Sequence, residues 1–224
     1  MQLHPLFMRK TFLFLVILAT ACSHSSKQKE IHHAPVYTRQ QQATELNDYP
    51  SVLSAAKSFK QKGIVTDSFE TIFSRFIVDS IIPYWYGTKW NFYGTTEEPN
   101  KGTIACGYFV TTVLRDAGLR INRIKLAQAA SEEMIRTVCI RKSIKRYSHT
   151  PMQTFITELL QLENGLYVVG LDFHTGFIYH NNDALYFIHS SYQTPQCVIK
   201  QNAGASSILA SSKYKVIGKV NLKL

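Results

Sequence analysis

The pattern of apolar residues changes near Gly165, and this change constrains the fold more than any other feature of the chain. Before it, apolar residues recur every three or four positions, which predicts amphipathic helices over 51–62, 67–82, 106–117, 126–138 and 151–162. After it, short apolar runs predict strands over 165–171, 175–180, 184–190, 197–200 and 215–222. The polar triplet 181–183 is typical of a hairpin turn. Helices followed by antiparallel strands indicate an α+β domain.

The first 22 residues predict a secretion signal, with a basic pair, a short apolar run and small residues before Cys22. A Cys in that place resembles a bacterial lipoprotein signal, in which the Cys is lipidated and becomes the mature N-terminus. An ordinary signal cleaved near Cys22 is the alternative. The polar segment 23–45 predicts a flexible linker, so the expected organisation is signal 1–22, linker 23–45 and folded domain 46–224.

The formal net charge of the chain is +10, which favours anionic partners such as nucleic acid, membrane lipids or acidic polymers. The basic residues are scattered, and no Arg/Lys block or aromatic–basic motif singles out nucleic acid. We therefore expect a solvated basic surface and no nucleic-acid partner.

The chain has four cysteines, and no two have the CxxC spacing of a zinc site. Cys139 and Cys197 are compatible either with a disulfide in an oxidising compartment or with two buried thiols. The sequence leaves that choice open.

Cys106 follows a Gly-containing loop and begins the amphipathic segment 106–117. The positive end of a helix dipole at that place favours the thiolate form of the Cys. A nucleophile also needs a base and a group that orients the base. His174 opens one predicted strand and His189 lies in the return strand, so a hairpin would bring the two together. A zinc site built from these two and His180 is disfavoured, because no carboxylate or Cys ligand is placed with them.

Three blocks, in this order, resemble the NlpC-type cell-wall cysteine peptidases, a papain-like superfamily. The blocks are Pro-Tyr-Trp-Tyr-Gly-Thr at 83–88, Ala-Cys-Gly-Tyr-Phe-Val at 105–110, and His-Thr-Gly-Phe-Ile at 174–178 followed by Phe-Ile-His-Ser at 187–190. Ala105 stands where the family pattern has Asp, and Thr88 where it has a second Gly. These departures indicate a divergent branch.

The resemblance implies a papain-like fold with Cys106 at the start of a central helix packed on an antiparallel sheet. It makes Cys106 the nucleophile, His174 the general base and His189 the residue that orients the base. The hydroxyl of Tyr84 would help to hold the oxyanion. Four further residues would contact the substrate: Trp85, Tyr86, Gly107 and Tyr108. No cofactor and no metal are expected.

The function that the resemblance implies is hydrolysis of amide bonds in peptidoglycan stem peptides through a thioester acyl-enzyme. Together with the signal, it predicts a protein of the bacterial cell envelope, anchored to the membrane by a lipid on Cys22, on the periplasmic side of the outer membrane. The alternative is an inactive domain of the same fold that binds glycan, peptide or a partner protein.

Overall fold

The structure is a computed structural model that describes residues 48–62, 67–182 and 184–224. All of these belong to the compact unit His33–Leu224. The predicted signal 1–22, the lipidation site Cys22 and the predicted linker 23–45 lie outside the described residues.

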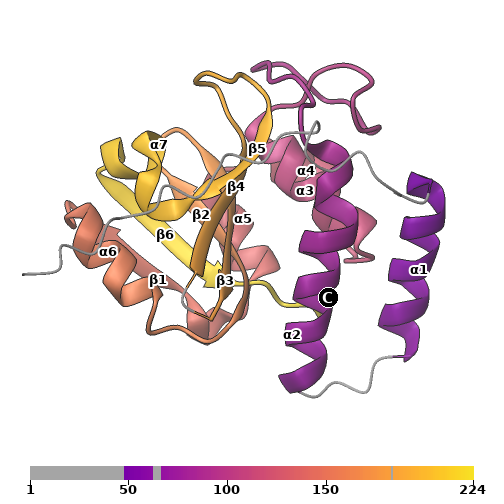
Figure 1. Ribbon diagram of the computed structural model, residues 1–224, viewed down its shortest axis with the longest axis horizontal. Helices are drawn as coiled ribbons and strands as arrows, with labels where there is room; N and C mark the ends of the chain where they lie inside the picture. The colour runs from indigo at the N-terminus through magenta and orange to yellow at the C-terminus, as the bar shows by residue number, and fades with distance from the viewer. Residues whose placement is uncertain (1–47, 63–66, 183) are drawn as a thin grey trace, which may run out of the picture. The chain divides into compact units, whose positions relative to one another are not determined.

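The described residues form an α+β domain built on one antiparallel sheet of six strands (Figure 1). The helices are α1 (Tyr49–Lys62), α2 (Asp67–Phe76), α3 (Cys106–Asp116), α4 (Arg123–Ala127), α5 (Ser131–Val138), α6 (Met152–Leu159) and α7 (Ser207–Ser211). The strands are β1 (Lys145–Ser148), β2 (Gly165–Leu171), β3 (Thr175–Asn181), β4 (Ala184–Ser190), β5 (Val198–Asn202) and β6 (Tyr214–Lys219). Their order in the sheet is β1-β6-β2-β3-β4-β5. The predicted α+β class is confirmed.

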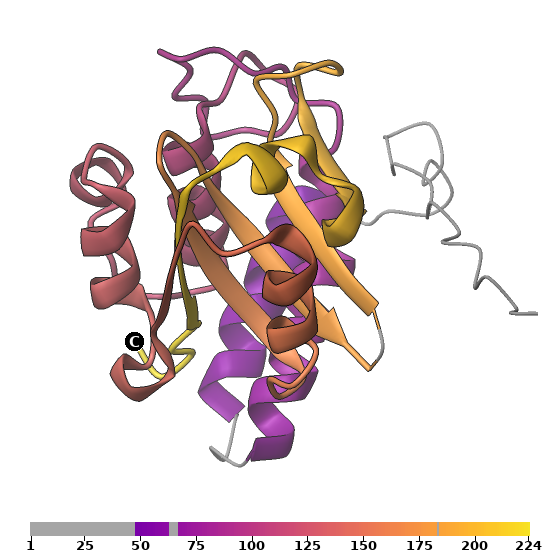
Figure 2. The same cartoon turned by 90° about the vertical axis from the view of Figure 1, so that its left-hand side faces the viewer.

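Helices cover both faces of the sheet, which explains why β2 is buried along its whole length. Leu166 and Val168 pack into a core shared with α1, α2, α3 and α5. The alternate residues, Tyr167 and Val169, pack into a second core shared with α6 and α7. Figures 1 and 2 show the sheet between these two groups of helices.

Strands β3 and β4 form the predicted hairpin. Asn181 pairs with Ala184, and Asn182 adopts a left-handed backbone conformation with φ of 54°. Asn is among the few residues that enter this conformation readily, so the turn follows from its sequence.

The predicted helix 126–138 is wrong as a single element, because two helices occupy this stretch. Asn122 caps α4 by accepting a hydrogen bond from the Lys125 backbone N–H at 3.0 Å. The chain then becomes extended at Ala130, and α5 begins with Glu132 and Glu133 in its first turn. Acidic residues in that position favour a helix start. The apolar residues keep helical spacing through 126–138, so the sequence pattern did not indicate a break there.

The helix predicted over 67–82 was expected to end at Pro83, but the helical backbone continues through that residue. After α2, a π-helical turn (Ile77–Ile81) leads directly into a 3-10 helix (Ile82–Trp85). Pro83 lies in the first turn of that 3-10 helix, where the N–H that proline lacks has no helical partner to lose. The helical spacing of apolar residues over 67–82 also predicts Ile72 on the apolar face, but its side chain is 54% exposed.

Candidate active site

Cys106 is the first residue of α3 and is half-buried. The preceding residue, Ala105, has extended backbone, and within the described part of the chain no side chain caps the helix. The side chain of an alanine accepts no hydrogen bond, so the N–H groups of the first turn stay available to another acceptor.

Two separate segments hold the backbone just before Cys106. The Ser190 hydroxyl at the end of β4 donates to the Ile104 carbonyl at 2.7 Å. From the loop 86–103, the Lys89 carbonyl accepts from the Ile104 N–H at 2.9 Å and the Gly94 carbonyl accepts from the Ala105 N–H at 2.8 Å. The end of β4 is thereby tied to the start of α3, which fixes Cys106 relative to the strand that carries His189.

His174 lies in the turn between β2 and β3, and His189 lies on β4. The Nε2 atom of His174 is 2.9 Å from Nδ1 of His189, and the two rings are nearly perpendicular at 86°. The ring of His189 stacks on Phe187, with centroids 4.0 Å apart. A side chain at Gly176 would place Cβ only 2.8 Å from the Cβ of His189, so this glycine leaves the room that the histidine needs. The predicted meeting of the two histidines is confirmed.

Cys106 and His174 line one cavity of about 210 Å³, together with Gly107 and Thr175. The backbone of Thr175, the residue after His174, hydrogen-bonds the Cys106 sulfur. Because His189 engages Nε2 of His174, Nδ1 is the ring nitrogen left for the thiol. The structure thus brings together the three residues that the sequence predicts to carry the chemistry.

A second cavity of about 630 Å³ adjoins the first and shares part of its wall. Leu171, Asp172, Phe173 and His174 line both cavities. Phe173 is 96% exposed, and the ring of Tyr192 from the second cavity lies 5.2 Å from that of His174. The two hollows together form a groove that passes the candidate base.

Burial keeps the reacting groups neutral at rest. Burial raises the pKa of the Cys106 thiol, and hydrogen bonds from the backbone of Thr175 and Gly107 oppose the rise only in part. Burial lowers the pKa of His174 to about 3. It also places the pKa of His189 well below its ordinary value, with a further lowering from His174. The N–H groups at the helix start do lower the pKa of the thiol, as the sequence predicts, but desolvation outweighs them and the pKa is raised overall.

Tyr84 is not among the residues that line either cavity of the groove. Its ring lies 5.1 Å from that of Tyr49, and its hydroxyl is buried without a hydrogen-bond partner in the described part of the chain. Burial is the main reason why its pKa is raised. Its backbone carbonyl accepts from the Asn100 side chain at 2.8 Å, and its role as an oxyanion donor stays a prediction.

Trp85 and Tyr86, predicted to contact substrate, are both buried in the core. The Trp85 indole donates to the Tyr49 hydroxyl at 2.8 Å, and that hydroxyl donates to Asp116 at 2.6 Å. The aromatic block folds as a short helix whose rings point inward, so neither residue reaches the groove.

The two predicted substrate residues on α3 occupy different places. Gly107 lines the cavity, and a Cβ there would lie 2.4 Å from the Ala127 carbonyl oxygen, so only glycine lets α4 approach this closely. Tyr108 packs under α4 instead. Its hydroxyl accepts from Gln128 at 3.1 Å, and the Arg123 guanidinium lies 4.8 Å from the centre of its ring.

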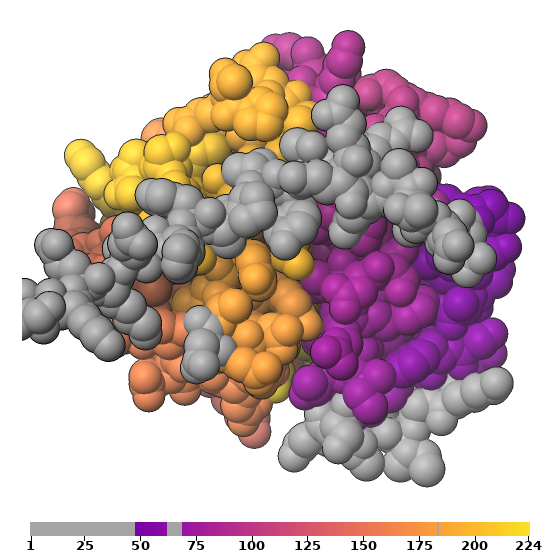
Figure 3. Space-filling model, in the orientation of Figure 1, coloured from indigo at the N-terminus to yellow at the C-terminus, as the bar shows by residue number. Residues whose placement is uncertain are grey.

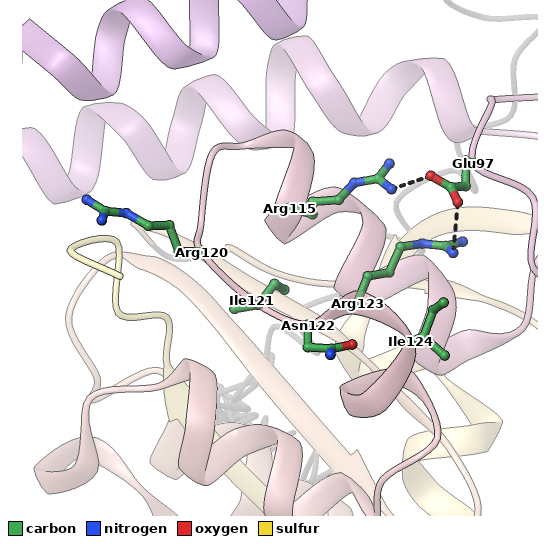
Figure 4. A pocket seen from close by; sticks show the side chains of 7 residues that line it. All are labelled: Glu97, Arg115, Arg120, Ile121, Asn122, Arg123 and Ile124. Atoms are coloured by element: carbon green, nitrogen blue, oxygen red, sulfur yellow. Dashed lines mark hydrogen bonds and ion pairs between the residues drawn. The ribbon is translucent and has the colours of Figure 1, made fainter.

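The loop 86–103 is anchored at both of its sides. Its start pairs with the segment 196–198 through backbone bonds from Gly87 and Trp90, and Figure 3 shows these two parts of the chain adjoining on one edge of the molecule. On the other side Glu97 joins Arg115 and Arg123 across a hollow of about 570 Å³ (Figure 4). Glu97 therefore holds the loop over α3 and α4, and this ionic cluster fixes the backbone that leads into Cys106.

Sequence reasoning missed Gln201 on β5. Its amide Nε2 lies 3.1 Å from Nε2 of His189 and 3.1 Å from the hydroxyl of Ser206. Only the register of β4 against β5, in which Phe187 pairs with Gln201, brings this side chain to the histidine. The sequence pattern carries no signal for that register.

Within residues 48–62, 67–182 and 184–224, no group of His, Cys, Asp and Glu residues is arranged to hold a metal ion. His180 lies instead beside the backbone carbonyls of Glu163 and Asn182, at 3.2 and 2.6 Å. In the same part of the chain Cys106, Cys139 and Cys197 are all free thiols. No helix among these residues combines the length and the apolar character needed to cross a membrane.

Comparison of the chain with protein-family models, with curated proteins and with solved structures gave no match.

Proposed function

We propose that this protein is a cysteine peptidase or amidase of papain-like fold that hydrolyses amide bonds in peptidoglycan stem peptides. The observation that carries the proposal is the contact between His174 and His189, at 2.9 Å, beside a cavity that His174 shares with Cys106. A nucleophile, a base and a group that orients the base are the parts that amide hydrolysis by a Cys enzyme requires.

The first chemical step follows from the neutral resting state. Because the pKa of the thiol is raised and that of His174 is lowered, the proton of Cys106 passes to His174 as the sulfur attacks the carbonyl carbon. The imidazolium so formed donates its Nε2–H to His189 in the tautomer in which Nδ1 of His189 is the acceptor. The carbonyl oxygen becomes an oxyanion, and the uncapped N–H groups at the start of α3, with that of Cys106 among them, are its donors.

The second step splits the amide. His174 gives its proton to the leaving amine, which departs and leaves a thioester on Cys106. Water then attacks the thioester with His174 again as base, releasing the acid and restoring the thiol. Each proton that His174 accepts is returned within the same half of the cycle.

The groove suits a peptide that extends past the catalytic residues. The carboxylates on its wall are already engaged: Glu132 with Arg146 and Tyr214, and Asp172 with the backbone N–H groups of Lys213 and Tyr214. Lys213 is among the residues that line the same cavity, and its positive charge would attract an acidic stem peptide. The net charge of +10 acts in the same direction.

The experiment is release of soluble fragments from purified sacculi, followed by chromatography. Wild type and Cys197→Ser, a matched change at another half-buried thiol, should release fragments, whereas Cys106→Ser should release none while keeping its unfolding transition. Equal release by Cys106→Ser would refute the assignment of the nucleophile.

The second candidate function is binding without hydrolysis, and the raised pKa of the Cys106 thiol favours it. A domain of this kind would pellet with sacculi and release nothing, and Cys106→Ser would pellet as well as wild type. Release by wild type excludes this candidate.

The proposal places the protein in the bacterial envelope, on the periplasmic side of the outer membrane, with a lipid on Cys22. Labelled palmitate should enter the full chain in cells and should not enter Cys22→Ala. Equal labelling of both chains would contradict the anchor.

A further inference from the structure

Both ring nitrogens of His189 are occupied. Nδ1 lies 2.9 Å from Nε2 of His174, and Nε2 lies 3.1 Å from the amide Nε2 of Gln201. A neutral imidazole has one N–H and one acceptor nitrogen, so the partner at one nitrogen decides what the other can do. His189 is fully buried, which keeps water from substituting for either partner.

The orientation of the Gln201 amide therefore decides the tautomer of both histidines. With its NH₂ toward His189, as in the structure, Nε2 of His189 accepts and its proton sits on Nδ1. That proton is donated to Nε2 of His174, which then carries its own proton on Nδ1. In this state His174 cannot take a proton from the thiol.

A half-turn of the Gln201 amide reverses the direction of both hydrogen bonds, the one from Gln201 to His189 and the one from His189 to His174. The Gln201 carbonyl oxygen then accepts from Nε2–H of His189, and Nδ1 of His189 accepts from Nε2–H of His174. Nδ1 of His174 is left free to take a proton, and the resulting imidazolium keeps a hydrogen-bond acceptor. The hydroxyl of Ser206, 3.1 Å from the amide, satisfies either orientation because it both donates and accepts.

We propose that Gln201 is a positioning residue, and that the orientation of its amide sets whether His174 can act as the base for Cys106. The role of His174 as a base rests on the proposed function. The coupling of the Gln201 amide to the two tautomers does not, and it can be measured without substrate.

The test compares two variants of Gln201. The Gln201→Glu side chain only accepts hydrogen bonds, and the Gln201→Leu side chain neither donates nor accepts them. Gln161→Leu, a matched change at an exposed glutamine, is the control. Long-range ¹H–¹⁵N spectra of the imidazole rings report the tautomers directly. We expect Gln201→Glu to place the proton of both histidines on Nε2, Gln201→Leu to lose a single preferred tautomer, and Gln161→Leu to match wild type. If Gln201→Leu fails to fold, Gln201→Met, of similar length, replaces it in the same comparison.

The kinetic readout separates positioning from packing. Gln201→Leu should lower kcat by about ten- to a hundred-fold with little change in KM, as is common when a residue supporting a catalytic group is lost. Gln201→Glu should retain kcat, and its negative charge should move the acid limb of kcat/KM to higher pH. A residue that only fills space would show neither the rescue by Glu nor the shift of that limb.

Failure of this inference and failure of the proposed function give different results. Unchanged tautomers in Gln201→Glu, with hydrolysis intact, would overturn the role of Gln201 and leave the peptidase standing. Tautomers that respond as expected, in a protein that hydrolyses nothing, would support the coupling and refute the peptidase.

Discussion

Lowering the pH from 7 to 5 should destabilise the fold, because two buried histidines resist protonation. His174 has a pKa of about 3 in the folded chain, against about 6.5 when unfolded. Between these values the unfolded state binds more protons than the folded state, so the free energy of unfolding falls as the pH falls. The lowered pKa of His189 acts in the same direction.

The size of the effect follows from the two pKa values of His174. At pH 5 its unfolded form is almost fully protonated and its folded form is almost fully neutral, which lowers the free energy of unfolding by about 2 kcal/mol relative to pH 7. Most carboxylates stay ionised over this interval. The buried Asp116, whose pKa is raised by burial, contributes equally to wild type and variants and cancels in their difference.

The assay is urea unfolding at both pH values for wild type, His174→Gln and His149→Asn. Wild type should lose at least about 2 kcal/mol between pH 7 and pH 5, and His174→Gln should lose about 2 kcal/mol less than wild type. His149 is exposed, with φ of 53°, a conformation that asparagine also adopts, so His149→Asn should keep the pH dependence of wild type. Equal pH dependence in wild type and His174→Gln would refute the buried, neutral histidine.

Three further predictions follow from single contacts. Gly107→Ala should lower the free energy of unfolding by about 1–3 kcal/mol, because its Cβ would lie 2.4 Å from a carbonyl oxygen of α4, and unchanged urea unfolding would contradict that contact. Tyr49→Phe should cost about 1–3 kcal/mol because it removes the hydrogen bond to buried Asp116, whereas Tyr93→Phe at an exposed site should cost under about 0.5 kcal/mol; equal losses would contradict the network. Phe173→Ala should raise KM roughly ten-fold or more on peptide substrates at unchanged thermal stability, since burying a Phe is worth about 2 kcal/mol, and an unchanged KM would remove it from the groove.

The change of apolar spacing near Gly165 was enough to predict the α+β class and the central strands. Strand β2 matches its predicted bounds, and β3 and β4 lie within one residue of theirs, because turn residues such as Asn182 punctuate the chain where the strands end. The same spacing placed His174 directly before β3 and His189 on β4, the strand that pairs with β3. The register of a hairpin fixes which side chains meet. The proximity of the two histidines could therefore be predicted from the sequence.

The aromatic block at 83–88 shows where such reasoning stops. A run of aromatic residues serves equally well in a core or in a groove, and composition does not say which side of the backbone turns inward. Here Trp85 is held inward by a bond to Tyr49, a residue 36 positions away. The long-range packing that decides its direction leaves no mark on the local pattern.

Gln201 and the protonation states were out of reach for a different reason. The register of β4 against β5 depends on how the segment 191–197 folds, and no periodicity reports it. The helix dipole at Cys106 was visible in the sequence, but the burial that outweighs it arises only when the groove walls assemble. Local signals predict the groups that are present, and tertiary packing sets their pKa values.

Digestion of purified muropeptides, followed by mass spectrometry, tests the central claim most directly. Wild type should cleave one amide bond of the stem peptide, with a mass gain of one water shared between the two products. Cys106→Ala and His174→Ala should leave the same muropeptides intact at equal protein concentration. Cleavage by Cys106→Ala at the wild-type rate, or intact muropeptides after incubation with folded wild type, would contradict a Cys–His hydrolase at this site.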